Sequence, residues 1–338
     1  MPPDTIIDTE TPPQSRATTA RALVARLSSD PLGGVVAALI IIFIVACCLS
    51  PYFLTRFNMT IIARSLAFIG LVTIGQSLLM ILGELDLSVG AIGGLSGIAG
   101  GTLMVQYGVN PWVAVGLCLL LGTGCGFING TLVTRLRLHS LVLTIGMAGV
   151  YGGAILVATK GVAITGIPHE ISFLGAGKAF GLPIPFIVLL VCLLVIVFVM
   201  QKTPLGRYVY AIGSNPDAAR MLGLRVAGIR TAAFATAGFL SALAGILMVA
   251  RLGSAQPSIG DTWVLSPIAA AVIGGVATTG GIGSPLGAVL GAVIIGIIEN
   301  IIVLFGISPY WQAIVSGGIV VLAISFDAVT RRFLNKGV

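Results

Sequence analysis

The sequence predicts an all-α polytopic membrane protein, and three observations lead to this fold class. Hydrophobic residues make up 57% of the chain and charged residues only 9%, whereas a soluble domain carries about 25% charged residues. The apolar residues form long runs, not the short alternating segments of a β-barrel. The glycines recur at spacings that let transmembrane helices pack closely. Examples are Gly93/Gly97/Gly101, Gly122/Gly126 and Gly283/Gly287/Gly291.

The N-terminal segment, residues 1–30, is polar and contains four prolines. We predict a disordered tail followed by a short helix whose Arg16, Arg21 and Arg26 face the membrane surface. The first apolar run begins too late in the chain for a cleavable signal peptide. A transmembrane domain over residues 31–330 and a short C-terminal tail, residues 331–338, complete the predicted organisation.

Ten apolar runs follow the tail, and each approaches the roughly 20 residues that a membrane-spanning helix needs. The predicted spans are about 32–53, 61–82, 87–107, 112–133, 141–158, 184–200, 231–249, 264–278, 286–305 and 310–326. The eighth of these runs is short. An even number of spans places both termini on the same side of the membrane.

The lysines and arginines predict which side that is. With ten spans, five of the 18 basic residues fall on the face opposite the termini: Arg56, Arg64, Lys160, Lys178 and Arg251. The remaining basic residues share the face of the termini, and cytoplasmic loops carry this excess. We therefore expect both tails and the polar loop 203–226 in the cytoplasm. The net charge of +7 reflects the same bias and predicts no nucleic-acid partner.

The loop 203–226 is the longest polar segment after the N-terminal tail. Within it Asn215 suits an N-cap, Pro216 suits the first helical position, and Gly223 suits the end of a helix. The loop is therefore predicted to present a short exposed helix. These local signals fit a docking element for a soluble partner and a structured connector equally well.

Two polar breaks interrupt the predicted spans. The first contains Glu84, Asp86 and Ser88 between the second and third spans. Carboxylates within a membrane are costly, so they mark a cavity, a partner or a membrane face. The favoured interpretation is a cytoplasmic turn in which Asp86 or Ser88 caps the third span. The second break, 278–285, carries no charge and is also expected on the cytoplasmic side.

A few polar residues lie within or near the spans. Gln76, Asn129, Asn300 and Gln312 either line a pathway or form hydrogen bonds between helices, and bonding between helices is the more common use. A weak internal repeat is also visible. Asn129 and Gly146 are separated by the same distance as Asn300 and Gly317, and such repeats are typical of transporters.

Motifs of several enzyme classes are missing from the sequence. It has no Walker A motif and no nucleophile elbow. The five cysteines lie inside apolar runs without metal-ligand spacing, which predicts small packing residues. We therefore expect no catalytic residue, no metal and no cofactor on this chain, which is not predicted to hydrolyse a nucleotide.

Several motifs together resemble one family. They are GELDLSVG at 83–90, GRYVYAIGSNPDAA at 206–219 and IAAAVIGG at 268–275, with Asn129-Gly130 and Thr144-Ile145-Gly146 between them. The sequence is similar here to the membrane permease subunit of ATP-binding-cassette (ABC) importers for ribose, xylose, galactosides and related monosaccharides. The resemblance covers about residues 35–330.

The resemblance implies a homodimer in the bacterial plasma (inner) membrane, with a sugar pathway near its two-fold axis. It implies a cytoplasmic ABC ATPase that binds ATP and Mg²⁺ and contacts the loop 203–226, called here the coupling loop. A periplasmic or extracellular binding protein would deliver the sugar. The residues that the resemblance assigns to the ATPase contact are Gly206, Arg207, Asn215, Ala218, Ala219 and Gly223.

Some residues depart from the family pattern. Glu84 stands where a glycine is usual, and His139 where a proline is common, so the substrate stays open. Two alternatives remain. An ion-driven secondary transporter would need paired ionisable groups within the membrane, for which the candidates are Glu299 with Glu84 or Asp86. A related permease for branched-chain amino acids would need a charged site for a zwitterion, and the sequence shows no dedicated one.

Overall fold

The computed structural model describes residues 31–308, 311, 314, 317–318 and 321–322, so both predicted tails lie outside the described residues. The longer helices are α2 (Pro31–Leu49), α3 (Arg56–Ile81), α4 (Val89–Val105), α5 (Pro111–Leu136), α6 (Ser140–Thr159), α8 (Ile184–Lys202), α11 (Val226–Leu252) and α13 (Pro285–Leu304). The shorter ones are α7 (His169–Ala176), α9 (Pro204–Ser214), α10 (Pro216–Met221) and α12 (Leu265–Ile273).

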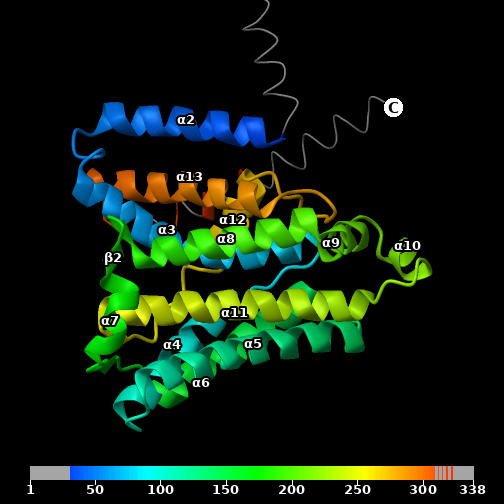
Figure 1. Cartoon of the computed structure of the whole chain (residues 1–338), viewed down its shortest axis with the longest axis horizontal. Helices are drawn as coiled ribbons and strands as arrows, with labels where there is room; N and C mark the ends of the chain where they lie inside the picture. The colour runs from blue at the N-terminus through cyan, green and yellow to red at the C-terminus, as the bar shows by residue number, and fades with distance from the viewer. Residues whose placement is uncertain (1–30, 309–310, 312–313, 315–316, 319–320, 323–338) are drawn as a thin grey trace, which may run out of the picture.

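The long helices lie side by side along one axis of the molecule (Figure 1). One end of this bundle carries α9 and α10, and we call it the α9–α10 end. The opposite end, the α7 end, carries α7 and two short antiparallel ladders. These pair β1 (Ile164–Thr165) with β4 (Ser254–Ala255), and β2 (Lys178–Ala179) with β3 (Leu182–Pro183).

Helix α11 lies at the centre of the bundle and packs against α3, α4 and α5. Of the candidate membrane spans among the described residues, α11 is the most deeply buried. Helix α13 packs on α12, α3 and α2, and α2 and α6 lie at opposite edges (Figure 1). These two edge helices are the least buried of the candidate spans. The core is therefore a layer of helices around α11 and α3.

Seven helices of the described residues are long and apolar enough to cross a membrane, and α4 is a shorter apolar helix. An all-α polytopic membrane fold is thereby confirmed. The predicted number of spans, ten, is larger than the seven candidate spans among the described residues. The predicted span 310–326 falls largely outside the described residues. Helix α3 begins at Arg56 and α11 at Val226, each five residues before its predicted start.

The predicted span 264–278 is wrong as a single helix. Only the nine-residue α12 forms there, and it extends about 14 Å of the roughly 30 Å hydrocarbon core. Gly275, with a φ of +82°, follows the helix end and turns the chain in a left-handed conformation that glycine favours. Hydrogen-bonded turns over residues 256–263 precede α12. The chain therefore returns from the α7 end partly through turns and partly through α12.

The predicted glycine pairs form the helix seams of the bundle. A side chain at Gly126 would meet the backbone of α11 at Phe234, and one at Gly93 would meet Ser241 of the same helix. In the same way Gly291 faces the backbone of α12 at Ala270. Close backbone approach of this kind is how small residues hold transmembrane helices together. The helix-packing role is confirmed for Gly93, Gly126 and Gly291, whereas Gly283 lies before α13 with a φ of +128° and faces Val276, which is outside α12.

The charges of the described residues separate along the bundle. The α9–α10 end carries Arg135, Arg137, Lys202, Arg207, Arg220, Arg225 and Arg230. The α7 end carries Arg56, Arg64, Lys160, Lys178 and Arg251. Two contacts anchor the second group: Arg64 Nη2 donates to the carbonyl of Ala176 at 2.6 Å, and the Arg251 guanidinium lies over the Phe68 ring.

Candidate transport site and docking surface

Two non-helical segments interrupt the helices of the bundle. The first, residues 82–88, joins α3 to α4, and the second, residues 256–264, joins β4 to α12. The second segment reaches the start of α4, just after the first segment, where the backbones of Gly90 and Gly260 lie so close that neither position has room for a side chain. Non-helical backbone at membrane depth is tolerated only where protein buries it or where it lines a water-filled cavity. The meeting point is therefore a place to look for a pathway.

A pocket of about 660 Å³ lies at this meeting point, and we call it the pathway pocket. Its walls are the start of α4, one face of α6 and the turn segment from Pro257 to Asp261. Its volume is in the range of small-molecule sites, about 300–1,000 Å³. Asp261 is exposed and, among the described residues, has no ion-pair partner. The pocket thus offers one free carboxylate and Ser258 in a mainly apolar lining.

A buried polar network holds the first break segment in place. The Ser88 amide and hydroxyl donate to Asp86 Oδ1 at 2.8 and 2.6 Å, and Asp86 is fully buried. Asn129 Nδ2 of α5 donates to the Ser88 hydroxyl at 2.8 Å. The Tyr151 hydroxyl of α6 donates to Asn129 Oδ1 at 3.0 Å. Each side chain in this chain of bonds has a partner, as buried polar groups require.

The backbone of the break segment is also satisfied by α6. The Leu85 amide donates to the Ser140 hydroxyl at 3.2 Å, and the Leu87 amide donates to the Thr144 hydroxyl at 3.0 Å. Two side chains of one helix therefore replace the hydrogen bonds that a continuous α3–α4 helix would have made. Specific hydrogen bonds from α6 therefore stabilise the break between α3 and α4.

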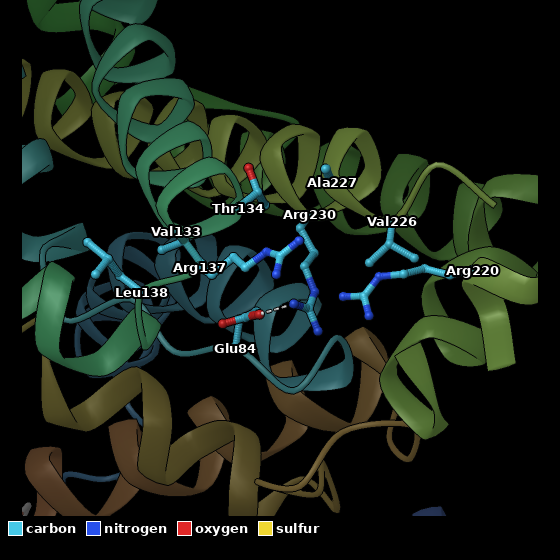
Figure 2. Close-up of a pocket in the computed structure, with 9 residues that line it drawn as sticks. All are labelled: Glu84, Val133, Thr134, Arg137, Leu138, Arg220, Val226, Ala227 and Arg230. Atoms are coloured by element: carbon cyan, nitrogen blue, oxygen red, sulfur yellow. Dashed lines mark ion pairs between the residues drawn. The ribbon is translucent and has the colours of Figure 1, made fainter. Parts of the chain in front are cut away.

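Glu84 forms an ion pair with Arg230, the carboxylate Oε1 lying 3.1 Å from Arg230 Nη1 (Figure 2). Only 7% of Glu84 is exposed. The pair joins the first break segment to α11 at the α9–α10 end. Glu84, Asp86 and Ser88 do lie in the predicted turn between two helices, but their side chains are buried. Ser88 precedes α4 without a side-chain cap, and its own amide is capped by Asp86.

The other predicted polar residues have different surroundings. Asn300 of α13 and Asn58 of α3 exchange two amide hydrogen bonds, at 2.9 and 2.8 Å. Gln76 is fully buried, and its amide atoms have no hydrogen-bond partner among the described residues. Asn129 and Asn300 are absent from the lining of the pathway pocket, and their bonds favour helix packing. Gln312 lies outside the described residues.

The coupling loop contains the predicted short helix, α10. The Asn215 side-chain oxygen accepts hydrogen bonds from the Asp217 and Ala218 amides at 3.1 and 3.0 Å. Pro216 is the first helical residue, and Gly223 follows the helix with a φ of +81°. The predicted N-cap, first residue and terminating glycine are all confirmed. The structure adds α9, which precedes α10 and was not predicted.

The surface of α9 and α10 is both apolar and basic. Met221 and Leu222 are 90% and 80% exposed at the tip of the bundle, and Arg207 is exposed on α9. Exposed apolar groups of this size mark interaction sites. Of the residues assigned to the ATPase contact, Gly206 and Ala219 are buried, and the others are exposed: Arg207, Asn215, Ala218 and Gly223. We call the exposed surface of α9 and α10 the docking surface.

Sequence reasoning missed Asp261, Tyr151 and the partner of Glu84, Arg230. The signal for Asp261 was present, because Gln256-Pro257-Ser258 and Gly260-Asp261 interrupt two apolar runs. No local pattern marks Tyr151 or Arg230, since their roles depend on contacts between distant helices. The described residues bring no three metal-ligating side chains together.

Comparisons with known proteins agree with this architecture. Residues 58–324 match the family described as "Branched-chain amino acid transport system / permease component". The chain is 37% identical over 293 residues to the ribose import permease of Bacillus subtilis (strain 168), covering 86% of this chain and 90% of that protein. It is 33% identical over 290 residues to the fructose import permease of Rhizobium meliloti, covering 83% and 80%.

A third relative carries a different cargo name. It is the autoinducer 2 import system permease of Photorhabdus laumondii, 33% identical over 282 residues, which cover 83% of this chain and 84% of that protein. The resemblance to sugar importer permeases is thereby confirmed, and the spanning helices make the chain a multi-pass membrane protein. On this match the chain belongs to the family of branched-chain amino acid transport system permease components, among whose members it resembles import permeases for sugars.

Proposed function

We propose that the chain is the permease subunit of an ATP-driven ABC importer and that it carries a monosaccharide or similar polyol across the bacterial inner membrane. The observation that carries the proposal is the pathway pocket at the meeting of two non-helical segments. Transport sites form where discontinuous helices meet near the middle of the membrane. The ribose and fructose import permeases among the relatives support the sugar class.

The lining of the pathway pocket suits a neutral polyol. The Asp261 carboxylate and the Ser258 hydroxyl can accept hydrogen bonds from sugar hydroxyls. No lysine or arginine lines this pocket, so an amino-acid zwitterion would find no partner for its carboxylate. Few polar groups also mean weak binding, which lets a transported molecule leave.

The docking surface supports a cytoplasmic ATPase as partner, with ATP and Mg²⁺ bound by that partner. The exposed Met221 and Leu222 offer apolar contact, and Arg207 offers a charge. Seven basic residues at the α9–α10 end against five at the α7 end favour a cytoplasmic docking surface. A sugar-binding protein would then meet the α7 end.

A homodimer would complete the pathway. Helix α6 lines the pathway pocket and lies at the edge of the bundle, and its Gly146, Gly149 and Gly153 have open space where a side chain would extend. A second copy packed on this face would close the pocket. Gly149→Cys, placed in a chain without its native cysteines, should cross-link two copies in native membranes. A chain that stays monomeric under oxidation would contradict this interface.

The substrate is tested by uptake in a strain that lacks the gene for this chain. Labelled ribose, fructose and leucine are offered in turn, with and without the restored gene. Restored uptake of a sugar that persists when a protonophore collapses the proton gradient supports the proposal. Restored leucine uptake would favour the amino-acid alternative, and uptake abolished by the protonophore while ATP is maintained would favour an ion-driven transporter.

A further inference from the structure

A second pocket, of about 520 Å³, opens at the α9–α10 end, and we call it the arginine pocket. Its lining comes from the end of α5, the start of α11, α10 and the first break segment. Figure 2 shows Arg137, Arg220 and Arg230 extending from three different elements toward the same space. Glu84 supplies the one carboxylate among the residues of this lining.

The charges of the arginine pocket do not balance. Three guanidinium groups against one carboxylate leave its lining with a net charge of +2. Glu84 is paired with Arg230 at 3.1 Å, while Arg230 Nε is buried without a hydrogen-bond partner among the described residues. Arg220 pairs with Asp217, an exposed residue outside the lining, and the described residues give Arg137 no ion pair. Positive charge is therefore left over.

The backbone around the arginine pocket also contributes positive charge. Arg137 follows α5 with a φ of +54°, a left-handed conformation that is uncommon outside glycine. Val226 and Ala227, the first residues of the 27-residue α11, line the pocket, and no side chain caps that helix start. The positive end of the α11 dipole thus faces the pocket, although the carbonyl end of α5 offsets part of its field.

We propose that the arginine pocket binds the phosphate group of an anionic molecule, supplied by a phospholipid headgroup or by free phosphate. Guanidinium groups match phosphate oxygens in geometry and charge. The pocket lies at the ends of two candidate spans, and the apolar Leu136 and Leu138 beside it are 61% and 45% exposed. Basic pockets between transmembrane helices at the cytoplasmic side are sites for anionic headgroups. This site is separate from the pathway pocket and does not depend on the cargo.

A bound phosphate would have a structural consequence. It would bridge Arg220 of α10, Arg137 at the end of α5 and Arg230 of α11, which line one pocket. Helix α10 would then be held to α5 and α11. In this way the lipid composition of the membrane would influence the position of the docking surface.

The test uses the full chain in nanodiscs of phosphatidylcholine alone or with 30% phosphatidylglycerol. Native mass spectrometry measures the anionic lipid retained by wild type and variants. Arg137→Asn suits the left-handed backbone and should lower retention about fivefold, as should Arg220→Gln. Arg135→Gln is the matched control, because Arg135 is exposed in the same turn of α5 but does not line the pocket. Glu84→Gln should raise retention, because it frees Arg230.

The outcomes separate the two sources of phosphate. Inorganic phosphate is titrated into the phosphatidylcholine nanodiscs, and the melting temperature is followed. Stabilisation by phosphate alone that is lost in Arg137→Asn supports the site with the free anion as its ligand. Unchanged lipid retention and unchanged phosphate response in Arg137→Asn and Arg220→Gln would overturn the proposal. If Arg135→Gln lowers lipid retention as much as Arg137→Asn does, the proposal is also overturned. It is overturned as well if Arg137→Asn and Arg220→Gln still bind lipid and phosphate but no longer co-purify with the ATPase.

Discussion

At the scale of single residues, the few ionisable groups inside the bundle have distinct tasks. Asp86 is buried in a hydrogen-bonded network, and Glu84 is paired with Arg230. Asp261 differs from both, since it lines a pocket and has no ion-pair partner among the described residues. An unpaired polar group that lines a pocket is a candidate for binding a ligand. We propose that Asp261 contacts the sugar.

The first prediction concerns that carboxylate. Asp261→Asn should lower sugar uptake roughly tenfold, the effect of losing a charge-assisted hydrogen bond, and should leave the amount of protein in the membrane unchanged. Glu170→Gln is the control, because Glu170 is a carboxylate at the same α7 end but outside the pocket. Wild-type uptake in Asp261→Asn would remove Asp261 from the pathway.

The second prediction concerns the buried network. Asn129→Leu keeps the volume of the side chain but leaves Ser88 and Tyr151 short of a partner, which should cost about 2 kcal/mol of stability. Tyr151→Phe removes only one hydroxyl and should cost less. The melting temperature of the purified protein in detergent checks both variants. Equal melting temperatures for Asn129→Leu and wild type would show that the network does not hold the break segment.

Local residue patterns predicted some of these roles and not others. The cap at Asn215 follows from side-chain chemistry within a few residues, so the sequence predicts α10 correctly. The partner of Asn300 is Asn58, more than two hundred residues earlier in the chain. No pattern in one sequence identifies such a pair. The sequence could therefore select candidate polar residues but could not tell packing residues from pathway residues.

At the scale of secondary-structure elements, the glycine seam between α5 and α11 determines how closely the central helices approach. Gly126 and Gly130 of α5 face the backbone of α11. Gly124, on the same helix, has nothing within reach of an added side chain. The spacing of Gly122 and Gly126 in the sequence predicts a packing face on this helix, but only the packed structure shows that its partner is α11.

The third prediction uses this contrast. Gly126→Val should destabilise the fold by about 3 kcal/mol or more, because the obstructing atoms belong to backbone and cannot move aside. Gly124→Val makes the same change in helix propensity without the clash and serves as control. The yield of monodisperse protein after detergent extraction checks the pair. Similar yields for the two variants would contradict the α5–α11 seam.

The fourth prediction concerns the docking surface. Arg207→Glu should weaken co-purification of the proposed ATPase at least tenfold, since it reverses the charge that Arg207 offers to the partner. Arg207→Lys keeps the charge and should retain most of the ATPase. Membrane insertion should be the same for both variants. If Arg207→Glu recovers as much ATPase as wild type, Arg207 lies outside the contact.

The helices themselves show where sequence reasoning fails at this scale. Long apolar runs predict α2, α3, α5, α6, α8, α11 and α13 well, because twenty apolar residues have few alternatives in a membrane. The run 264–278 is equally apolar, yet it contains only α12. Hydropathy predicts that an apolar segment is removed from water. It does not predict whether that segment forms one continuous helix or a helix followed by turns. The breaks are also where the pathway pocket forms.

At the scale of the whole molecule, the proposed function depends on the α9–α10 end, the α7 end and the pathway pocket. The docking surface lies at one end and α7 with the short ladders at the other, while the pathway pocket is lined by α4, α6 and the turn segment before α12. Glu84 joins the first break segment to α11, close to the arginine pocket. Arg220 of α10 lines the same pocket as this ion pair, so the arginine pocket brings the docking surface close to the break segment.

The measurement that tests the central claim most directly is transport by the complex reconstituted in liposomes. The chain is purified from native membranes with its associated subunits, and labelled sugar uptake is measured with the binding protein outside and ATP inside. The account predicts uptake that requires enclosed ATP and Mg²⁺ and that an ion gradient cannot replace. Uptake driven by a proton or sodium gradient without ATP would contradict it.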